Sequence, residues 1–448
     1  MHQGRRASRL TAILAALAFL PFAAAQSCDE QAELLFTFWG SPQEKTAIES
    51  MVETFNAEHP CITVETQHIP SSGYTEKIST MLAAGDPPDV AYLDSFIALP
   101  WAEAGRLLDL TDYFQNDPDA GRLESTFYRY GDDQILGTNT AAETMVMYYR
   151  KDLFDEAGVA YPPSDPDDAW TWDEFVEVAK ELTVDRNGNR ASSPDFDPNA
   201  IRTYGVAFPR WWAGYLPFIY SNGGRFASED GTRLMLNEPE AVEVLQAMQD
   251  LIYLHHVAPT PSQAQAMPST DVMMQSGQVA MDINGHWKTI DYSALPMDWD
   301  VAVLPKFDEP ATVAFGAPTV IFADTEYPDA AFEFYKFHND PSEVDLFAKG
   351  LWMPLQAEYY TDPEMTATWL EGIEGVYPSG AQGAFVDYTW GHTSNQPPEY
   401  WLRNLNEINN AAVNPAMDLI WSNELTAQEA MDRAVEDAEG LMQGRWTD

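Results

Sequence analysis

The amino-acid sequence predicts an α/β protein with two lobes. Residues 34–93 read as strand, helix, strand, helix and strand, which is typical of a parallel sheet with right-handed crossovers. Within this stretch, the segment AAGDPPDVAYLD at 83–94 combines the end of a helix, a proline turn and a short apolar run. About 420 residues follow the N-terminal targeting segment, which is more than one hydrophobic core normally serves.

Five elements are expected in the first hundred residues. They are strands at 34–39, 62–69 and 90–93, and helices at 44–59 and 74–84. Each helix is supported by apolar residues three and four positions apart, and Pro60 and Gly85 end the two helices. The third strand ends on Asp94, and in open α/β sheets ligands bind at the carboxyl ends of the strands. The sequence therefore predicts that Asp94 faces a ligand cleft.

The middle of the chain continues to alternate between helix and strand. Expected strands are at 135–138, 144–149, 204–208, 279–283, 299–304 and 319–323, and expected helices at 102–114, 172–182 and 239–254. Thr171, with Glu174 three residues later, is a capping box that marks one helix start. Beyond Pro328 the chain is expected to be mostly helical. Because neither a repeat nor a low-complexity linker separates the lobes, the chain is expected to cross between them several times.

The first residues have the pattern of a targeting segment. Arginines precede an apolar run at 10–22, and alanines at 23–25 offer a cleavage site before Gln26. The apolar run is too short to span a membrane. Gln26 and Ser27 are not the small apolar pair of a lipoprotein signal, which argues against a lipid anchor on Cys28. We therefore expect a cleaved signal peptide and a periplasmic or exported mature protein.

The charge of the chain excludes some partners. The formal net charge is −46, which disfavours nucleic acid and anionic membrane surfaces. The acidic excess fits either solubility alone or a saline medium outside the cell, and the sequence does not choose between them.

Two cysteines, Cys28 and Cys61, remain after removal of the signal peptide. Export favours a disulfide between them, and two free thiols are the alternative. Each cysteine precedes an expected strand, at 34–39 and at 62–66. If these strands are parallel neighbours, both cysteines lie at the amino-terminal edge of the sheet, away from the ligand.

Seven segments carry a resemblance to a known family. They are FTFWGS (36–41), AAGDPPDVAYLD (83–94), MYYRKDLFDEAGV (147–159), WTWDEFVEVAKEL (170–182), YSNGG (220–224), SGQVAMDINGHW (276–287) and VAVLPKF (301–307). In order and spacing they resemble extracellular solute-binding proteins of the maltose-binding-protein-like class, the family 1 sugar-binding components of ATP-binding-cassette importers. The departures are the two cysteines, the acidic excess and a polar loop at 185–198.

The resemblance implies the type II periplasmic-binding-protein fold, in which two lobes, each a mainly parallel sheet flanked by helices, enclose a ligand cleft. We expect a signal peptide at 1–25, a first lobe from 26–140 and 288–330, and a second lobe from 141–287 and 331–448 with a helical C-terminal part. The resemblance also implies closure of the lobes around a sugar and delivery to a membrane permease. We expect a monomer with no cofactor and no metal.

Candidate ligand contacts follow from the resemblance and from residue chemistry. Sugar rings stack on aromatic faces, and their hydroxyls pair with carboxylates and amides. The candidates are Trp39, Gly40, Ser41, Asp94, Glu143, Trp211, Trp212, Tyr215, Gly285, Trp287, Trp352 and Trp390.

The candidates differ in how strongly their position supports a ligand contact. Trp287 follows a strand and a turn in which Gly285 permits close approach of the backbone, so stacking on the ligand is favoured over core packing. At least one of Trp211 and Trp212 is expected to face the cleft, and the sequence does not decide which. Trp39 fits equally well as the last core residue of its strand. The C-terminal tryptophans, Trp401 among them, lie in a helical region that offers many packing roles.

Two acidic residues are singled out by their positions. Asp94 follows a buried strand and Glu143 precedes an expected crossing between the lobes, so both are expected to accept hydrogen bonds from ligand hydroxyls.

Asp185, Asn187 and Asn189 resemble part of a calcium loop. Phe196, however, stands where the bidentate Glu would be, which favours a polar turn.

The sequence thus predicts a protein that binds a neutral mono- or oligosaccharide and is not an enzyme. It contains no G-x-S-x-G, H-E-x-x-H or G-x-x-x-x-G-K motif. One alternative is a binder of another solute, such as a glycerol-phosphate ester, for which Arg210 beside the tryptophans is a candidate. The other alternative is a glycoside hydrolase, which needs two carboxylates beside the sugar bond. Acidic residues are so numerous in this chain that they neither support nor exclude such a pair.

Overall fold

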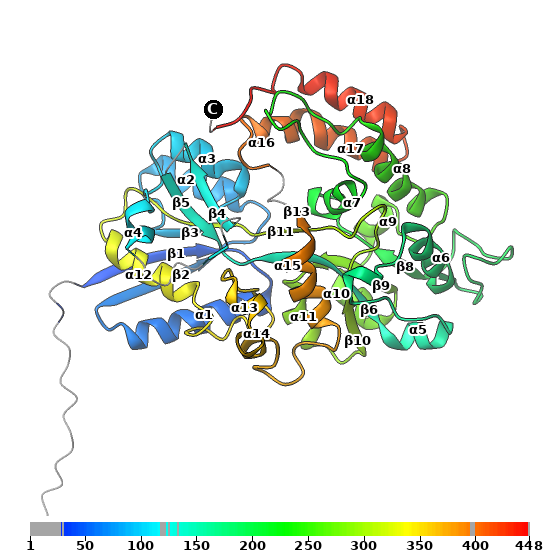
Figure 1. The fold of residues 1–448 in the computed structure, drawn as a ribbon, viewed down its shortest axis with the longest axis horizontal. Coiled ribbons are helices and arrows are strands. Elements are labelled where there is room, and N and C mark those ends of the chain that lie inside the picture. Colours follow the sequence, from blue (N-terminus) through cyan, green and yellow to red (C-terminus); the bar gives the residue numbers. More distant parts are fainter. Residues whose placement is uncertain are drawn as a thin grey trace, which may run out of the picture.

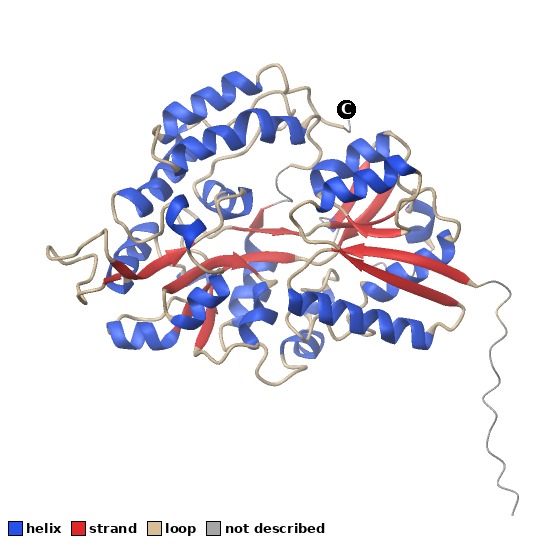
Figure 2. Cartoon of the chain, turned by 180° about the vertical axis from the view of Figure 1, so that it is seen from behind, coloured by secondary structure: helices blue, strands red, loops and turns tan. Residues whose placement is uncertain are grey.

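The computed structural model describes Cys28 and residues 31–116, 122–123, 126–131, 134–394 and 399–446. The expected signal peptide at 1–25 lies outside the described residues. The described chain forms two sheets that lie side by side, each covered by helices on both faces (Figures 1 and 2). This is the two-lobed α/β architecture that the sequence predicts.

The first sheet has the strand order β2-β1-β3-β12-β5-β4. Its strands are β1 (Ala32–Phe38), β2 (Ile62–His68), β3 (Val90–Tyr92), β4 (Phe127–Tyr130), β5 (Gln134–Asn139) and β12 (Pro318–Ile321). Strands β1, β2 and β3 are parallel, whereas β12 and β4 run antiparallel to their neighbours. The helices of this lobe are α1 (Pro42–Glu58), α2 (Tyr74–Ala84), α3 (Ser95–Glu103), α4 (Thr111–Gln115) and α12 (Pro328–His338).

Each face of the first sheet has its own apolar core. On one face, Phe36 packs edge-on against Phe334 of α12, with 5.2 Å between the ring centroids, in the cluster that also buries α1. On the other face, Ile78 of α2 and Leu99 of α3 pack against Ala91 of β3. Alternate residues of the buried strands therefore supply the two cores.

The second sheet has the order β13-β11-β6-β9-β8-β7, and β10 also pairs with β6. Its strands are β6 (Glu143–Arg150), β7 (Val184–Asp185), β8 (Ile201–Ala207), β9 (Val279–Gly285), β10 (Trp299–Ala302), β11 (Thr312–Phe315) and β13 (Thr393–Ser394). Of its pairs, β8–β9 and β11–β13 are parallel and the others antiparallel, so this sheet departs from the mainly parallel expectation. Its helices are α5 (Lys151–Ala157), α6 (Trp172–Leu182), α7 (Leu216–Ser221), α8 (Pro239–Tyr253), α9 (Pro261–Ala266), α10 (Thr270–Ser276) and α11 (Lys288–Ser293), with 3₁₀ turns η2 (Pro166–Asp168) and η3 (Trp212–Gly214).

The C-terminal part is mostly helical, as expected. Its elements are α13 (Glu358–Thr361), α14 (Pro363–Leu370), the π-helical η4 (Gln382–Asp387), α15 (Tyr388–His392), α16 (Leu405–Ile408), the π-helical η5 (Asn409–Val413), α17 (Asn414–Trp421) and α18 (Ala427–Ala438). Helices α17 and α18 pack on α8 of the second lobe, while α16 reaches α3 of the first lobe (Figure 1).

The chain crosses between the two sheets at neighbouring places. Residues 140–142 join β5 to β6, and residues 316–317 join β11 to β12. The two crossings lie against each other, since the Thr140 N–H donates to the Ala317 carbonyl at 2.7 Å. A third segment passes beside them, because the Ala142 N–H donates to the Met353 carbonyl at 3.1 Å.

The expected lobe boundaries need two corrections. Tyr292 of α11 packs edge-on against Tyr148 of β6, with 5.0 Å between the ring centroids, and strands β10 and β11 both pair with β6. Residues 288–315 therefore belong to the second lobe rather than the first. Helix α12 packs on the first sheet, although the expectation placed everything after 330 in the second lobe. An apolar run shows that a strand or helix exists, but the partner is decided by contacts distant in sequence.

The helix expected at 102–114 is also corrected. Helix α3 begins earlier and ends at Glu103, where Gly105 takes a left-handed conformation with φ of 67°. The chain then runs along the sheet, with the Leu108 N–H donating to Ile321 O and the Leu110 N–H to Ile135 O, each at 2.8 Å. Only Thr111–Gln115 returns to helix.

Cys28 and Cys61 form the predicted disulfide, with 5.4 Å between their Cα atoms. Ala32 pairs with Ile62 in parallel register, so the disulfide joins β1 and β2 at their amino-terminal ends.

The loop at 185–198 is held by Asp185, whose carboxylate accepts hydrogen bonds from the backbone N–H groups of Asn187, Asn189 and Asp197 at 2.8–3.0 Å.

The described residues contain neither a membrane-spanning helix nor a metal-binding cluster. None of the helices described here is long and apolar enough to cross a membrane. Within the same ranges, no cluster of three or more His, Cys, Asp or Glu side chains could hold a metal ion.

Candidate ligand-binding site

A cavity of about 790 Å³ lies between the lobes. The first lobe lines it with residues that follow β1 and β3, and the second lobe with the segments at 211–215 and 287–291. Both crossings and the C-terminal segment 406–414 contribute further residues. The cavity thus lies where strand ends of both sheets meet, as expected for an α/β ligand site.

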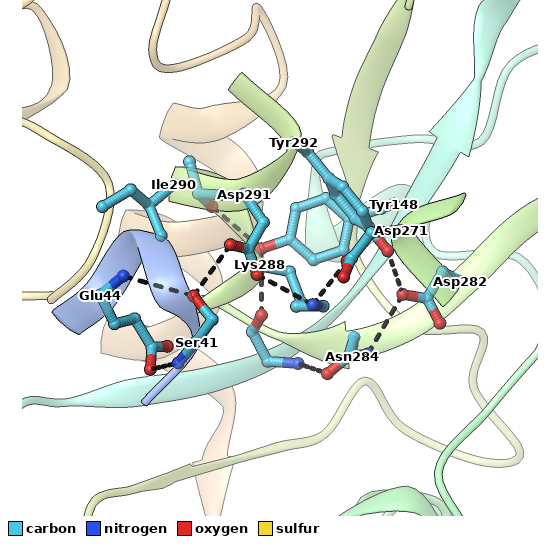
Figure 3. Close-up of polar contacts among 12 residues, drawn as sticks. Ser41, Glu44, Tyr148, Asp271, Asp282, Asn284, Lys288, Ile290, Asp291 and Tyr292 are labelled. Atoms are coloured by element: carbon cyan, nitrogen blue, oxygen red, sulfur yellow. Dashed lines mark hydrogen bonds and ion pairs between the residues drawn. The ribbon is translucent and has the colours of Figure 1, made fainter. Parts of the chain in front are cut away.

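One part of the cavity is built on the start of α1. Ser41 caps this helix in a capping box: the Glu44 N–H donates to Ser41 Oγ at 3.3 Å, and the Ser41 N–H donates to Glu44 Oε2 at 2.6 Å (Figure 3). Burial, together with the nearby carboxyl groups of Asp291 and Glu143, raises the pKa of Glu44 to about 8, against the lowering effect of the hydrogen bond from the Ser41 N–H. Glu44 is therefore mostly protonated at neutral pH.

A network formed by Lys288 and Asp291 of α11 and by Asp271 of α10 faces this helix start from the second lobe. Lys288 Nζ lies 2.9 Å from Asp291 Oδ2 and 2.5 Å from Asp271 Oδ1. Burial acts to lower the pKa of Lys288, but Asp291 and Asp271 raise it above its usual value, so the ammonium stays charged. Ser41 Oγ donates to Asp291 Oδ1 at 3.0 Å, which links the two lobes directly (Figure 3).

Glu143 begins β6 next to the crossing and is only 8% exposed. Burial raises the pKa of Glu143 well above its usual value, against a hydrogen bond from the Trp287 backbone. Its Oε2 lies 3.4 Å from Nδ1 of His286, and burial lowers the pKa of His286 to about 3, so that ring is neutral. Glu143 Oε2 has no hydrogen-bond partner among the residues described.

Aromatic rings form a wall on the side of the second lobe. The ring centroids of Trp211 and Trp287 are 6.3 Å apart, and Phe315 lies 4.6 Å from Trp212 and 5.6 Å from Trp287. Trp211 lines the cavity and remains 43% exposed, so part of its ring is accessible to a ligand. Such a wall offers flat apolar faces to a ring-shaped ligand.

Gly285 determines where the Trp287 ring lies. A Cβ atom at Gly285 would approach Trp287 Cζ3 to 1.9 Å, so the ring folds back over the strand end only because this residue is glycine. Gly285 itself is not among the described lining residues, and its role is to position Trp287.

The first lobe supplies Asp94 and Trp39. Asp94 caps α3 through a 3.0 Å hydrogen bond from the Phe96 N–H to its Oδ1, and burial raises the pKa of Asp94. Trp39 packs edge-on against Tyr74 and Tyr92, at 4.7 and 5.5 Å, and also lines the cavity. Trp39 therefore belongs to both the core and the site.

The structure brings ten of the twelve candidate contacts to this cavity, and Trp211 and Trp212 both line it. Their contact with a ligand remains a prediction. Gly285 lies behind Trp287, and Trp390 is not among the described lining residues. Trp390 is 52% exposed on α15, and its ring lies near-parallel to that of Tyr360 at 6.4 Å. Trp401 is likewise not among the lining residues, and the Arg445 guanidinium lies 4.0 Å from the centre of its ring.

Sequence reasoning missed several residues that line the cavity. They are Glu44, Lys288, Asp291, Phe315 and the asparagines Asn406, Asn409, Asn410 and Asn414. Glu44 was visible as the third residue after Ser41 in a capping-box pattern. The asparagines recur three and four positions apart, which places them on one helix face. For Lys288, Asp291 and Phe315 no local signal marks a cavity residue.

A family comparison decides the class of the protein. The family model described as bacterial extracellular solute-binding protein matches residues 39–344. The chain belongs to this family. The resemblance carried by the seven sequence segments is thereby confirmed. Two of the solved structures that the chain resembles are described as a substrate-binding protein and a solute-binding protein of ABC transporters.

Individual relatives of this solute-binding protein include sugar binders. The arabinooligosaccharide-binding protein of Bacillus subtilis is 24% identical over 363 residues, which cover 76% of this chain and 78% of that protein. A Listeria monocytogenes ABC substrate-binding protein, solved in complex with cycloalternan, superposes with a TM-score of 0.78 at 25% identity, covering 92% of this chain and 99% of the other. Maltose-bound MalE3 of T. maritima shares the fold, with a TM-score of 0.73 at 22% identity over 92% and 100% of the two chains.

Proposed function

We propose that this solute-binding protein captures a neutral mono- or oligosaccharide between its lobes and delivers it to an ATP-binding-cassette permease. The observation that carries the proposal is the aromatic wall of Trp211, Trp212, Trp287 and Phe315 in a cavity that also presents Glu44, Glu143 and Asp94. An apolar wall suits the C–H face of a sugar ring, and carboxyl groups suit its hydroxyls. No catalytic step is needed for this role.

Capture by closure of the lobes follows from the way the site is divided. Trp39, Ser41 and Asp94 belong to the first lobe, whereas Trp287 and Asp291 belong to the second. A ligand that touches both sets stabilises the closed arrangement, because only that arrangement offers all the contacts. The crossings at 140–142 and 316–317 are the segments about which the lobes would turn.

The charge around the cavity disfavours an anionic ligand. Arg210, the candidate for binding a phosphate, donates from Nη2 to the Pro259 carbonyl at 2.6 Å and is not among the described lining residues. Lys288 does line the cavity, but Asp271 and Asp291 already neutralise it. A phosphate ester would therefore meet no cation free to pair with it among the described lining residues.

We further propose that the protein acts outside the cytoplasm as a monomer, after removal of residues 1–25. The family is extracellular by description, and the Cys28–Cys61 disulfide fits an oxidising compartment. Mass measurement of the secreted protein and its elution in size-exclusion chromatography test both points. An intact N-terminus or a dimer would contradict them.

A thermal-shift screen against sugars, polyols and phosphate esters tests the proposed ligand class. A ligand at a hundred times its dissociation constant adds about 2.7 kcal/mol to the free energy of unfolding. We expect a saccharide to raise the melting temperature, and a chromogenic glycoside panel to show no turnover. A shift by phosphate esters alone, or steady turnover of a glycoside, would overturn the proposal.

A further inference from the structure

The C-terminal helices line the cavity with one kind of side chain. Asn406 of α16, Asn409 and Asn410 of η5, and Asn414 of α17 all belong to the lining. Their spacing of three and four residues places them along one face of a continuous helical run. In Figure 1, α16 and α17 lie above the two sheets, whereas α1 and α11, which carry the acidic part of the cavity, lie below.

Three of the asparagines form a ladder of hydrogen bonds. Asn410 Nδ2 donates to Asn406 Oδ1 at 3.0 Å, and Asn414 Nδ2 donates to Asn410 Oδ1 at 3.5 Å. Each link uses one donor of one amide and one acceptor of the next, so every amide keeps further hydrogen-bonding capacity. Asn410 and Asn414 are exposed, which leaves this capacity open to a ligand.

Asn409 is the second, independent sign of a binding surface. It is only 6% exposed, and its Nδ2 has no hydrogen-bond partner in the described part of the chain. It begins the π-helical turn η5, and such turns are frequent at functional sites. A buried amide donor without a partner lowers stability, unless a bound group accepts its hydrogen bond.

Asparagine is an unusual choice for a solvated helix face in this chain. It has a low helix propensity, because its side chain competes with the backbone for hydrogen bonds. Most charged side chains of this protein are acidic, and its net charge is −46. Four neutral amides on one face instead supply donors and acceptors together, which is the pattern that uncharged hydroxyl groups require.

We propose that the asparagine ladder, together with the buried Asn409 beside it, is a second recognition surface, which selects oligosaccharides over monosaccharides. The inference rests on the proposed function. One sugar ring occupies the aromatic wall and the carboxyl groups, and a following ring donates and accepts hydrogen bonds along Asn406, Asn409 and Asn410. The cavity volume of about 790 Å³ lies in the upper part of the range for ligand sites and leaves room for more than one ring.

Calorimetric titration with two saccharide series tests the ladder. The series are glucose, maltose and maltotriose, and arabinose, arabinobiose and arabinotriose, each added to the wild-type chain and to Asn409→Ala and Asn410→Ala variants. We expect wild type to bind the trisaccharide of one series more tightly than its monosaccharide. Each variant should lose about tenfold in trisaccharide affinity, as for one lost hydrogen bond, with monosaccharide affinity unchanged.

Controls separate the ladder from folding and from the proposed function. Asn187→Ala removes the same amide from an exposed loop and should leave both affinities unchanged. Equal melting temperatures of Asn410→Ala and wild type show that the exposed ladder residue is not needed for folding. Equal losses for monosaccharide and trisaccharide, or no loss, would overturn the ladder and leave the proposed function standing. If neither series binds wild type, the ladder and the saccharide proposal both fail.

Discussion

Ser41 Oγ donates a 3.0 Å hydrogen bond to Asp291 Oδ1, and the two residues belong to different lobes (Figure 3). Ser41 is also the N-cap of α1, so the same hydroxyl accepts the Glu44 N–H. Asp291 in turn holds Lys288 at the edge of the cavity. The contact between the lobes is thus tied to the local structure of a helix end.

Replacing Ser41 should loosen closure as well as the helix. Ser41→Ala removes a cap worth about 1 kcal/mol and the contact between the lobes. Small-angle X-ray scattering of the unliganded variant should show a larger radius of gyration than wild type. Thr426→Ala is the matched control, since Thr426 caps α18 in the same kind of capping box. Equal radii for all three proteins would show that the Ser41–Asp291 contact does not hold the lobes.

Truncation of Trp287 should remove most of the binding energy. Trp287→Ala takes away the ring that Gly285 positions at the centre of the aromatic wall, and affinity for a saccharide should fall about a hundredfold. Trp390→Ala is the control, because this exposed ring lies outside the cavity lining. Fluorescence titration of the three proteins measures the difference. Unchanged affinity in Trp287→Ala would reduce this residue to a packing role.

Glu44 should make stability fall as the pH rises. Burial raises the pKa of Glu44 from 4.5 to about 8, so between these values the folded state binds more protons than the unfolded state. The free energy of unfolding then decreases with rising pH in this window, by about 1.4 kcal/mol per pH unit for one proton. In urea denaturation at pH 5 to 8, the free energy of unfolding of Glu44→Gln should depend less on pH than that of wild type. Parallel pH profiles would mean that Glu44 does not titrate in this range.

The disulfide should stabilise the fold without affecting the ligand. Closing the 33-residue interval between Cys28 and Cys61 is worth about 3–4 kcal/mol by loop-closure entropy. A Cys28→Ser, Cys61→Ser double variant should lose about 3–4 kcal/mol of its free energy of unfolding, and it should therefore unfold at a lower urea concentration. Its saccharide affinity should equal that of wild type, because the disulfide lies at the amino-terminal edge of the sheet. A loss of affinity larger than the loss of stability explains would contradict this placement.

The sequence predicted best those parts of the fold that local patterns control. The β1–α1–β2–α2–β3 unit follows from apolar spacing, Pro60 and Gly85, and the position of Asp94 follows from the end of β3. The start of α6 follows from its capping box. These signals work because each depends on residues within a few positions of one another.

The remaining features depend on contacts between distant residues. No local sequence pattern indicates that β10 and β11 pair with β6, or that α12 packs on the first sheet. In the same way, Lys288 and Asp291 become site residues only because α11 faces the start of α1. Trp390 had the right residue type, but its helix turns that ring to solvent.

Calorimetric titration measures directly whether the cavity between the lobes holds a saccharide. Wild-type protein and Trp287→Ala are titrated with malto- and arabino-oligosaccharides and with glycerol 3-phosphate. We expect saturable one-to-one binding of an oligosaccharide to wild type, its loss in Trp287→Ala, and no binding of the phosphate ester. Binding of glycerol 3-phosphate with no heat from any saccharide, or equal oligosaccharide affinity in both proteins, would contradict it.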